Sequence, residues 1–225
     1  MDLLDQSLRR IACQVAGATA VFRDYQLDFC RNGNHPLREA AASAGVDAQA
    51  IVQRLHDLPT LHAVDECDWA QAAPHTLIAH ILERFHAVHR EQLPELIRLA
   101  RRVEQVHAER EGCPHGLADR LCEMQQELES HLQKEEMILF PMIERGAGAM
   151  AGGPINVMRM EHDQHGQALQ ELARLTNDIT LPHEACTTWR ALYLGLRTFR
   201  EDLLEHIQLE NNILFEQAQH GAARV

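Results

Sequence analysis

Two stretches of similar sequence contain the residues best suited to chemistry. HLQKEEMILF runs from His131 to Phe140 and HIQLENNILF from His206 to Phe215, and both begin H-x-x-x-E and end in ILF. On a helix, residues four apart lie one above the other on the same face, so each stretch can direct an imidazole and a carboxylate at one point. Two such helices facing each other would form a metal-binding box.

A second repeated pattern supplies one further histidine to each stretch. HAVHREQL from His86 and HDQHGQAL from His162 both read H-x-x-H-x-x-x-L. The first histidine precedes the H-x-x-x-E histidine by 45 residues in one case and 44 in the other, so the midpoints fall in the turn-like sequences VHAEREGCP and LPHEACT. Residues of an antiparallel hairpin lie level when the turn is centred between them. Each hairpin is therefore predicted to contribute two histidines and one glutamate at the same height.

Four histidines and two glutamates then converge between the two hairpins. Six nitrogen and oxygen ligands exceed the four of a structural zinc site and suit two iron or manganese ions bridged by carboxylates, which helical bundles can hold. With an oxo or hydroxo bridge, each ion keeps one open position for a small ligand. Exposed helix histidines, in a chain with 15 of them, would explain one H-x-x-x-E pair but not its repetition. The predicted terminal ligands are His86, His131, His162 and His206, and the predicted bridges are Glu135 and Glu210.

Three acidic residues near these ligands have two interpretations each. Glu127 and Asp202 stand four residues before His131 and His206, where they could hold a ring N–H or pass protons. The alternative is a half-buried ion pair. Glu161, which directly precedes a predicted ligand, is a further candidate.

Three other histidines are left without an assigned role. His89 and His165 occupy equivalent positions, one helical turn beyond His86 and His162. They could be additional ligands, hydrogen-bond donors to the ligands or buried core residues. His107 would lie about 31 Å from His86 along a straight helix. It is therefore assigned to the end of the bundle and not to the same metal pair.

Composition and apolar spacing predict an all-α protein. Aromatic residues make up only 4%, helix-forming residues are abundant, and apolar residues follow a 3-4 spacing from Ile78 to Ala100. Breaks rich in Gly and Pro separate four long helices, which predicts an up-down-up-down four-helix bundle at residues 75–225. A small helical domain at residues 1–60 and a linker at 61–74 are expected to precede it.

Charge and cysteine content narrow the function classes. The net charge of -12 argues against nucleic acid and acidic membrane surfaces as partners, and no segment approaches the roughly 18 apolar residues of a membrane span. Six cysteines without a C-x-x-C pair indicate free thiols, a reducing compartment and a cytoplasmic protein. Cys30 is interpreted either as an exposed thiol beside His35 or as a small buried residue. The oligomeric state stays open.

The chain as a whole resembles the hemerythrin-like di-iron bundle, and more closely the repair-of-iron-centres family, also called iron–sulfur cluster repair proteins. The matching blocks are RFHAVHREQLPEL, HLQKEEMILFPMI, EHD, HEACTTW, HIQLENNILF and, near the N-terminus, DFC-x-x-G. Classical oxygen-carrying hemerythrins match less well. They have H-x-x-x-H on the third helix and a final aspartate, where this chain has Gly166 and Glu210.

The resemblance implies a stress-response protein that repairs iron–sulfur clusters damaged by nitric oxide or peroxide, with two non-haem iron ions at the six predicted ligands. Iron donation and nitric oxide removal, including an activity of nitric oxide reductase type, both stay open. The alternatives are reversible binding, scavenging or sensing of nitric oxide or oxygen without turnover, and a metal-storing bundle. The expected partners are damaged iron–sulfur proteins. The family often has two adjacent cysteines near the N-terminus, but Arg31 follows Cys30 here, so only single-thiol chemistry at Cys30 is expected.

Overall fold

The protein is all-α, as predicted. The structure, a computed structural model, describes residues 3–15, 17–27, 29, 33–58, 69–147 and 150–221, and every regular element in these ranges is a helix. Cys30 lies outside the described residues. None of the helices in these ranges combines the length and the apolarity needed to cross a membrane.

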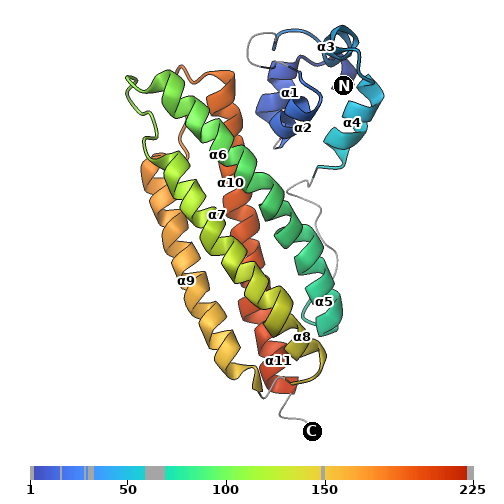
Figure 1. The fold of residues 1–225 in the computed structure, drawn as a ribbon, viewed down its shortest axis with the longest axis vertical. Coiled ribbons are helices and arrows are strands. Elements are labelled where there is room, and N and C mark those ends of the chain that lie inside the picture. The colour runs from blue at the N-terminus through green and yellow to red at the C-terminus, as the bar shows by residue number, and fades with distance from the viewer. Residues whose placement is uncertain are drawn as a thin grey trace. The chain divides into compact units, whose positions relative to one another are not determined.

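Four long helical stretches pack as the predicted four-helix bundle, and Figure 1 shows them in green, yellow-green, orange and red. Short loops with Gly112, Gly116 and Gly146 in the left-handed region of backbone conformation separate the first three stretches. The first stretch is α5 (Pro74–Ile81), a π-helical turn (Leu82–His86) and α6 (Ala87–His107), and the second is α7 (Leu117–Lys134), a π-helical turn (Glu135–Leu139) and α8 (Phe140–Glu144). The third is α9 (Gly152–Leu175), and the fourth is α10 (Thr187–Leu209), a π-helical turn (Glu210–Leu214) and α11 (Phe215–Gly221).

The N-terminal region consists of short helices whose ends follow from single residues. Asp47 caps α4 by accepting a hydrogen bond from the backbone N–H of Gln49 at 2.9 Å, and Gly45 ends α3 with φ 69°. Gly17 adopts φ 82° and separates the first two α-helices of this region. The short helices are the 3-10 turn Leu3–Asp5, α1 (Leu8–Gln14), α2 (Ala18–Asp24), α3 (Leu37–Ala44) and α4 (Ala48–His56).

Two compact units make up the chain. The first consists of Met1–Leu61, Pro94–Ala118 and Leu175–Thr198, and the second of His62–Leu93, Asp119–Arg174 and Phe199–Val225. Each unit thus combines segments that are distant in sequence. All six predicted metal ligands belong to the second unit, together with a cluster of buried apolar residues that includes Phe85, Phe140 and Phe215.

Candidate metal centre

The six predicted ligands meet in the interior of the second unit as two overlapping groups. Each group contains one histidine from each hairpin and both glutamates, with ligand atoms all within 4.8 Å of one another. The first group is His86, His206, Glu135 and Glu210, and the second is His131, His162, Glu135 and Glu210. Each metal position is therefore shared between the two hairpins.

The distances between the ligand nitrogens match the space that a metal ion requires. Nε2 of His86 lies 3.2 Å from Nε2 of His206, and Nε2 of His131 lies 3.1 Å from Nε2 of His162. Two nitrogens at right angles, each about 2.1 Å from one ion, are about 3 Å apart. The spacing of both pairs therefore already suits an ion.

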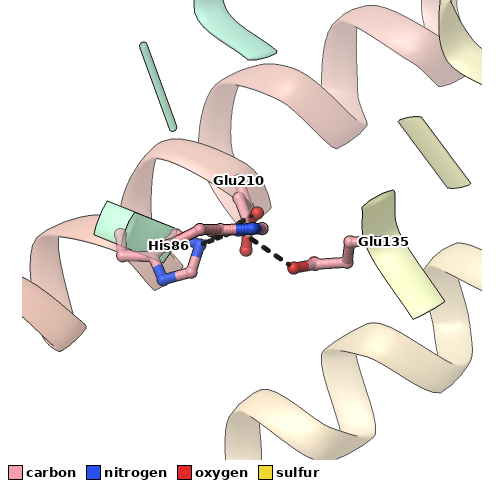
Figure 2. Close-up of side chains that lie close together, drawn as sticks. His86, Glu135 and Glu210 are labelled. Carbon is pink, nitrogen blue, oxygen red and sulfur yellow. Dashed lines mark hydrogen bonds and ion pairs between the residues drawn. The ribbon is translucent and has the colours of Figure 1, made fainter. Parts of the chain in front are cut away.

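Both glutamates present one oxygen to each group. Oε2 of Glu135 lies 3.5 Å from Nε2 of His86, and its Oε1 lies 3.4 Å from Nε2 of His131. For Glu210 the corresponding distances to the other two histidines are both 3.1 Å. Figure 2 shows the side chains of Glu135, Glu210 and His86 converging from three helical stretches. Two carboxylates placed in this way can bridge a pair of ions.

The chemistry of the buried oxygens also fits a pair of cations. All four carboxylate oxygens of Glu135 and Glu210 are buried, and none has a hydrogen-bond partner within the described ranges. The six ligand residues are at most 3% exposed, so water does not solvate these groups. Buried charge without a partner is strongly unfavourable, and a bound metal ion is one of the few groups that can compensate it.

Burial and neighbouring charges set the protonation of the ligands. Burial lowers the pKa of His86 to about 4 and that of His131 to about 4, so both imidazoles are neutral and free to bind a cation at neutral pH. Burial, reinforced by Glu210, raises the pKa of Glu135 well above its usual value. Burial is the largest single effect on Glu210 and acts to raise its pKa, but His206 and His162 together outweigh burial, so this pKa falls well below its usual value. A cation bound by the two carboxylates would therefore have to displace the proton that Glu135 holds.

A π-helical turn interrupts three of the four stretches at the site. Glu135 and Glu210 begin such turns and His86 ends one. A π-turn has wider i→i+5 hydrogen bonding and is frequent at functional sites. The wider turn lets consecutive residues face the interior, as Glu135 and Glu136 do. Apolar spacing carries no signature of these turns, and the sequence patterns do not predict them.

One ligand ring is held by an acidic residue that the sequence names as a candidate. Nδ1–H of His131 donates to Oε2 of Glu161 at 2.9 Å, and Glu161 also pairs with Lys134. A carboxylate on the outer ring nitrogen fixes the ring and makes the other nitrogen a stronger metal ligand. Glu161 thus takes the place predicted for Glu127.

Two further ring partners are absent from the sequence-based candidates. Nδ1–H of His86 donates to Oε1 of Glu136 at 2.8 Å, and Nδ1–H of His162 donates to Oδ1 of Asn211 at 3.0 Å. Both partners directly follow a bridging glutamate, Glu136 after Glu135 and Asn211 after the second bridge. The shared position in the two repeats is the signal that could have identified them.

The structure places Glu127 and Asp202 away from the ring nitrogens that they are predicted to hold. Glu127 is exposed and lies 3.3 Å from the guanidinium of Arg120. Asp202 is buried, and its two oxygens accept hydrogen bonds from Arg84 at 2.6 Å and from Gln92 at 2.9 Å. Because Arg84 and Gln92 occupy both oxygens, the ion-pair interpretation of Asp202 is the one observed.

Removing the Asp202 carboxylate should lower stability. In Asp202→Ala, Arg84 loses its buried partner, and we expect a loss of roughly 3 kcal/mol in the free energy of unfolding. Urea unfolding of the metal-loaded chain measures it. Glu171→Ala, which breaks the surface pair of Glu171 with Arg174, is the control and should leave the free energy of unfolding nearly unchanged. Equal losses in the two variants would contradict a structural role for Asp202.

His89 and His165 lie buried beside a ligand ring each. The ring centroid of His89 is 5.4 Å from that of His206, and the centroid of His165 is 4.9 Å from that of His131. Burial lowers the pKa of His89 well below its usual value and that of His165 to about 3, so both rings are neutral. Neither residue belongs to the two metal groups.

A cavity of about 580 Å³ between α6 and α7 reaches one of these buried histidines. Buried His89 lines it, together with exposed side chains such as Gln126 and Ser130. The ring of His89 also neighbours that of His206, so this cavity lies on the His206 side of the centre.

Neither His107 nor any of the described cysteines belongs to the two metal groups. Nε2 of His107 is 3.2 Å from Sγ of Cys186, and its ring is 5.2 Å from that of Trp189, all within the first unit. Cys113, Cys122 and Cys186 form no disulfide bond. No described cysteine is part of either metal group.

Comparison with known proteins gives matches to both regions of the chain. A family model described as the hemerythrin HHE cation binding domain matches residues 77–218, and one described as a domain of unknown function, ScdA_N (DUF542), matches residues 4–59. The iron–sulfur cluster repair protein YtfE of Dickeya chrysanthemi (strain Ech1591) is 51% identical over 221 residues, which are 98% of this chain and 100% of the relative.

Two further relatives give the same result. The iron–sulfur cluster repair proteins YtfE of Yersinia pseudotuberculosis serotype IB (strain PB1/+) and of Yersinia pestis (strain Pestoides F) are each 48% identical, again over 98% of this chain and 100% of the relative. The similarity thus extends over both matched regions and includes the helices that carry the six ligands. This chain therefore belongs to the family of iron–sulfur cluster repair proteins with a hemerythrin cation binding domain.

Proposed function

We propose that this chain restores damaged iron–sulfur clusters by means of two iron ions, one in each group of buried histidines and glutamates. The observation that carries this proposal is the pair of groups that share both carboxylates, in a chain about half identical to iron–sulfur cluster repair proteins over their whole length. Two nitrogen and two oxygen donors per ion suit iron and leave coordination positions open for a small ligand.

Burial of the ligands limits what can meet the ions. Because none of the six ligand residues is more than 3% exposed, a cluster bound inside another protein cannot touch the ions where they are held. Repair then takes one of two forms. Iron leaves the site and enters the damaged cluster, or a small molecule such as nitric oxide enters the site and is removed from the surroundings of the cluster.

The residues around the ligands suit both forms. In this proposal a small uncharged molecule approaches through the cavity that His89 lines, and the buried ring of His89 is neutral. Any proton that the chemistry needs would pass through Glu136 or Glu161, because these carboxylates bond ligand rings and are 28% and 18% exposed. In the proposed mechanism they replace Glu127 and Asp202 as proton carriers.

Transfer of iron is the first test. The chain is loaded anaerobically with a rare iron isotope and mixed with a purified iron–sulfur protein that has lost one iron from its cluster by oxidation. We expect the isotope to appear in the repaired cluster by Mössbauer spectroscopy, with recovery of that protein's activity. The control is the Glu135→Ala chain with the same total iron in solution, which should repair no faster than free iron.

The same mixture distinguishes the alternative function. Nitric oxide is added to the loaded chain, and nitrosyl formation and nitrous oxide in the headspace are followed. Nitrosyl formation without isotope transfer, without nitrous oxide and without protection of the cluster would identify a binding or scavenging protein. That result would overturn the proposed repair function.

A further inference from the structure

The internal repeat gives the metal centre a near-twofold symmetry, and one place where it fails is the residue directly before the first ligand of each repeat. Alignment of the two repeats matches His86 with His162, and the residue before each then differs. Glu161 precedes His162, whereas Phe85 precedes His86. The equivalent positions therefore hold a carboxylate in one half of the centre and a phenyl ring in the other.

Both of these residues contact the ligand on the neighbouring stretch, in different ways. Glu161 accepts a hydrogen bond from Nδ1–H of His131 at 2.9 Å. Phe85 instead stacks on the ring of His206, with centroids 5.3 Å apart and planes 6° from parallel. Nδ1 of His206 is buried and has no hydrogen-bond partner among the residues that the structure describes.

The other polar groups near His206 do not replace the missing acceptor. Asp202 lies one turn before it, but both carboxylate oxygens are bonded to Arg84 and Gln92. The ring of His89 is 5.4 Å away between centroids, and its two nitrogens have no partner in the described part of the chain. The immediate surroundings of the His206 ring thus provide stacking and no hydrogen bond at Nδ1.

The remaining surroundings are matched between the two positions. Phe140 stacks on His86 with centroids 5.7 Å apart, and Phe215 stacks on His162 at 5.9 Å. Each position also has one histidine whose ring is held by a carboxylate paired with a basic side chain. In one position Glu136 holds His86 and pairs with Arg90. In the other, Glu161 holds His131 and pairs with Lys134. The two positions differ in their second histidine. Asn211 holds Nδ1 of His162, whereas Nδ1 of His206 has no partner among the described residues.

A missing acceptor affects metal binding through the ring tautomer. A histidine that binds an ion through Nε2 carries its proton on Nδ1, and an acceptor at Nδ1 sets this tautomer before the ion arrives. His206 can instead keep its proton on Nε2 and donate to Nε2 of His86, 3.2 Å away, which accepts because His86 carries its own proton on Nδ1. Binding an ion exchanges that hydrogen bond for a buried N–H without an acceptor, which is unfavourable.

We propose that the two metal positions are unequal, and that the ion held by His86 and His206 is bound more weakly and leaves first. Phe85 is then the residue that sets this difference, as a positioning residue that stacks on His206 and offers no acceptor. The inference rests on the proposed function only in that the chain binds two ions. The inference identifies the ion at the position of His86 and His206 as the one that the chain would donate.

Release of iron to a chelator tests the inference on the whole chain. Protein loaded with two ferrous ions is mixed anaerobically with an excess of a coloured ferrous chelator. We expect two phases of equal size, one ion each, with rates that differ about 10–100-fold, the range by which partners of ligand histidines change metal affinity. Release of both ions in a single phase would overturn the inference.

Two reciprocal variants assign the phases to the two positions. Glu161→Phe gives His131 the surroundings of His206 and should speed the slow phase about 10–100-fold. Phe85→Glu gives His206 an acceptor and should slow the fast phase by a similar factor. Glu83→Phe, at an exposed position two residues from Phe85, is the control and should keep both phases.

The outcomes separate this inference from the proposed function. An unchanged slow phase in Glu161→Phe would overturn the inference, even if the loaded chain still transferred iron to damaged clusters. Two-phase release with the expected variant effects, but without transfer, would overturn the proposed function alone. Should the fully buried Phe85 position not tolerate glutamate, Glu161→Phe decides, because Glu161 is 18% exposed.

Discussion

Glu135→Ala should lose both metal ions and not only one. The two oxygens of Glu135 lie within 3.5 Å of ligand nitrogens in different groups, so a single substitution removes an oxygen donor from each position. Loss of a residue that only holds a ligand in place lowers metal affinity about 10–100-fold, and loss of a shared ligand should exceed the upper end of this range at both positions.

Metal content per chain after gel filtration measures the effect. Glu144→Ala is the matched control, because Glu144 is an exposed glutamate nine residues further along the same stretch. It should keep both ions. A Glu135→Ala chain that retained one tightly bound ion would show that Glu135 belongs to a single position and does not bridge.

The convergence of the six candidate ligands could be predicted from the sequence because it depends on local rules. Four residues make about one helical turn, so His131 and Glu135 share a face whatever the rest of the chain does. The turn between α6 and α7 lies midway between His86 and His131, so His86 faces His131 and Glu135 across the hairpin. The structure confirms that these three side chains meet, with Glu135 within 3.5 Å of both histidines.

The pairing between hairpins could not be predicted in the same way. Nothing in the spacing within one hairpin shows that His86 shares a position with His206 rather than with His131. That choice depends on how the two hairpins pack, which involves side chains far apart in sequence. The π-helical turns are a similar case, since Glu136 reaches His86 only because the helix widens there.

The expected partner of a ligand ring also depends on competition between distant residues. Asp202 stands one turn before His206, which is the right spacing for a contact along the helix. Arg84 and Gln92, more than 100 residues earlier, take both of its oxygens instead. Local spacing identifies candidates for a hydrogen bond, and tertiary packing decides which of them forms it.

Removal of both ions should strongly destabilise the chain. A ligand that binds only the folded state adds about 4 kcal/mol to the free energy of unfolding when its free concentration is about 1,000 times its Kd, and two ions contribute separately. Urea unfolding with and without a strong chelator measures the loss as a shift of the midpoint. An unchanged midpoint would mean that the ions contribute nothing to the folded state.

Replacing Glu135 with an apolar residue should abolish metal binding and at the same time stabilise the metal-free chain. Without ions, Glu135 is a fully buried carboxyl whose oxygens have no partner in the described structure, which costs about 1–3 kcal/mol. Glu135→Leu removes these oxygens and retains most of the volume, so the variant should be more stable than the metal-free parent by that amount.

Comparison of the two chains with and without metal separates binding from folding. With metal, the order should reverse, because only the parent gains the binding energy of the ions. Glu144→Leu, at an exposed position, should change the stability of the metal-free chain by less than about 0.5 kcal/mol. If metal-free Glu135→Leu were the less stable chain, Glu135 would contribute to the fold by itself. The predicted reversal instead means that this buried carboxylate is unfavourable for folding until an ion binds it.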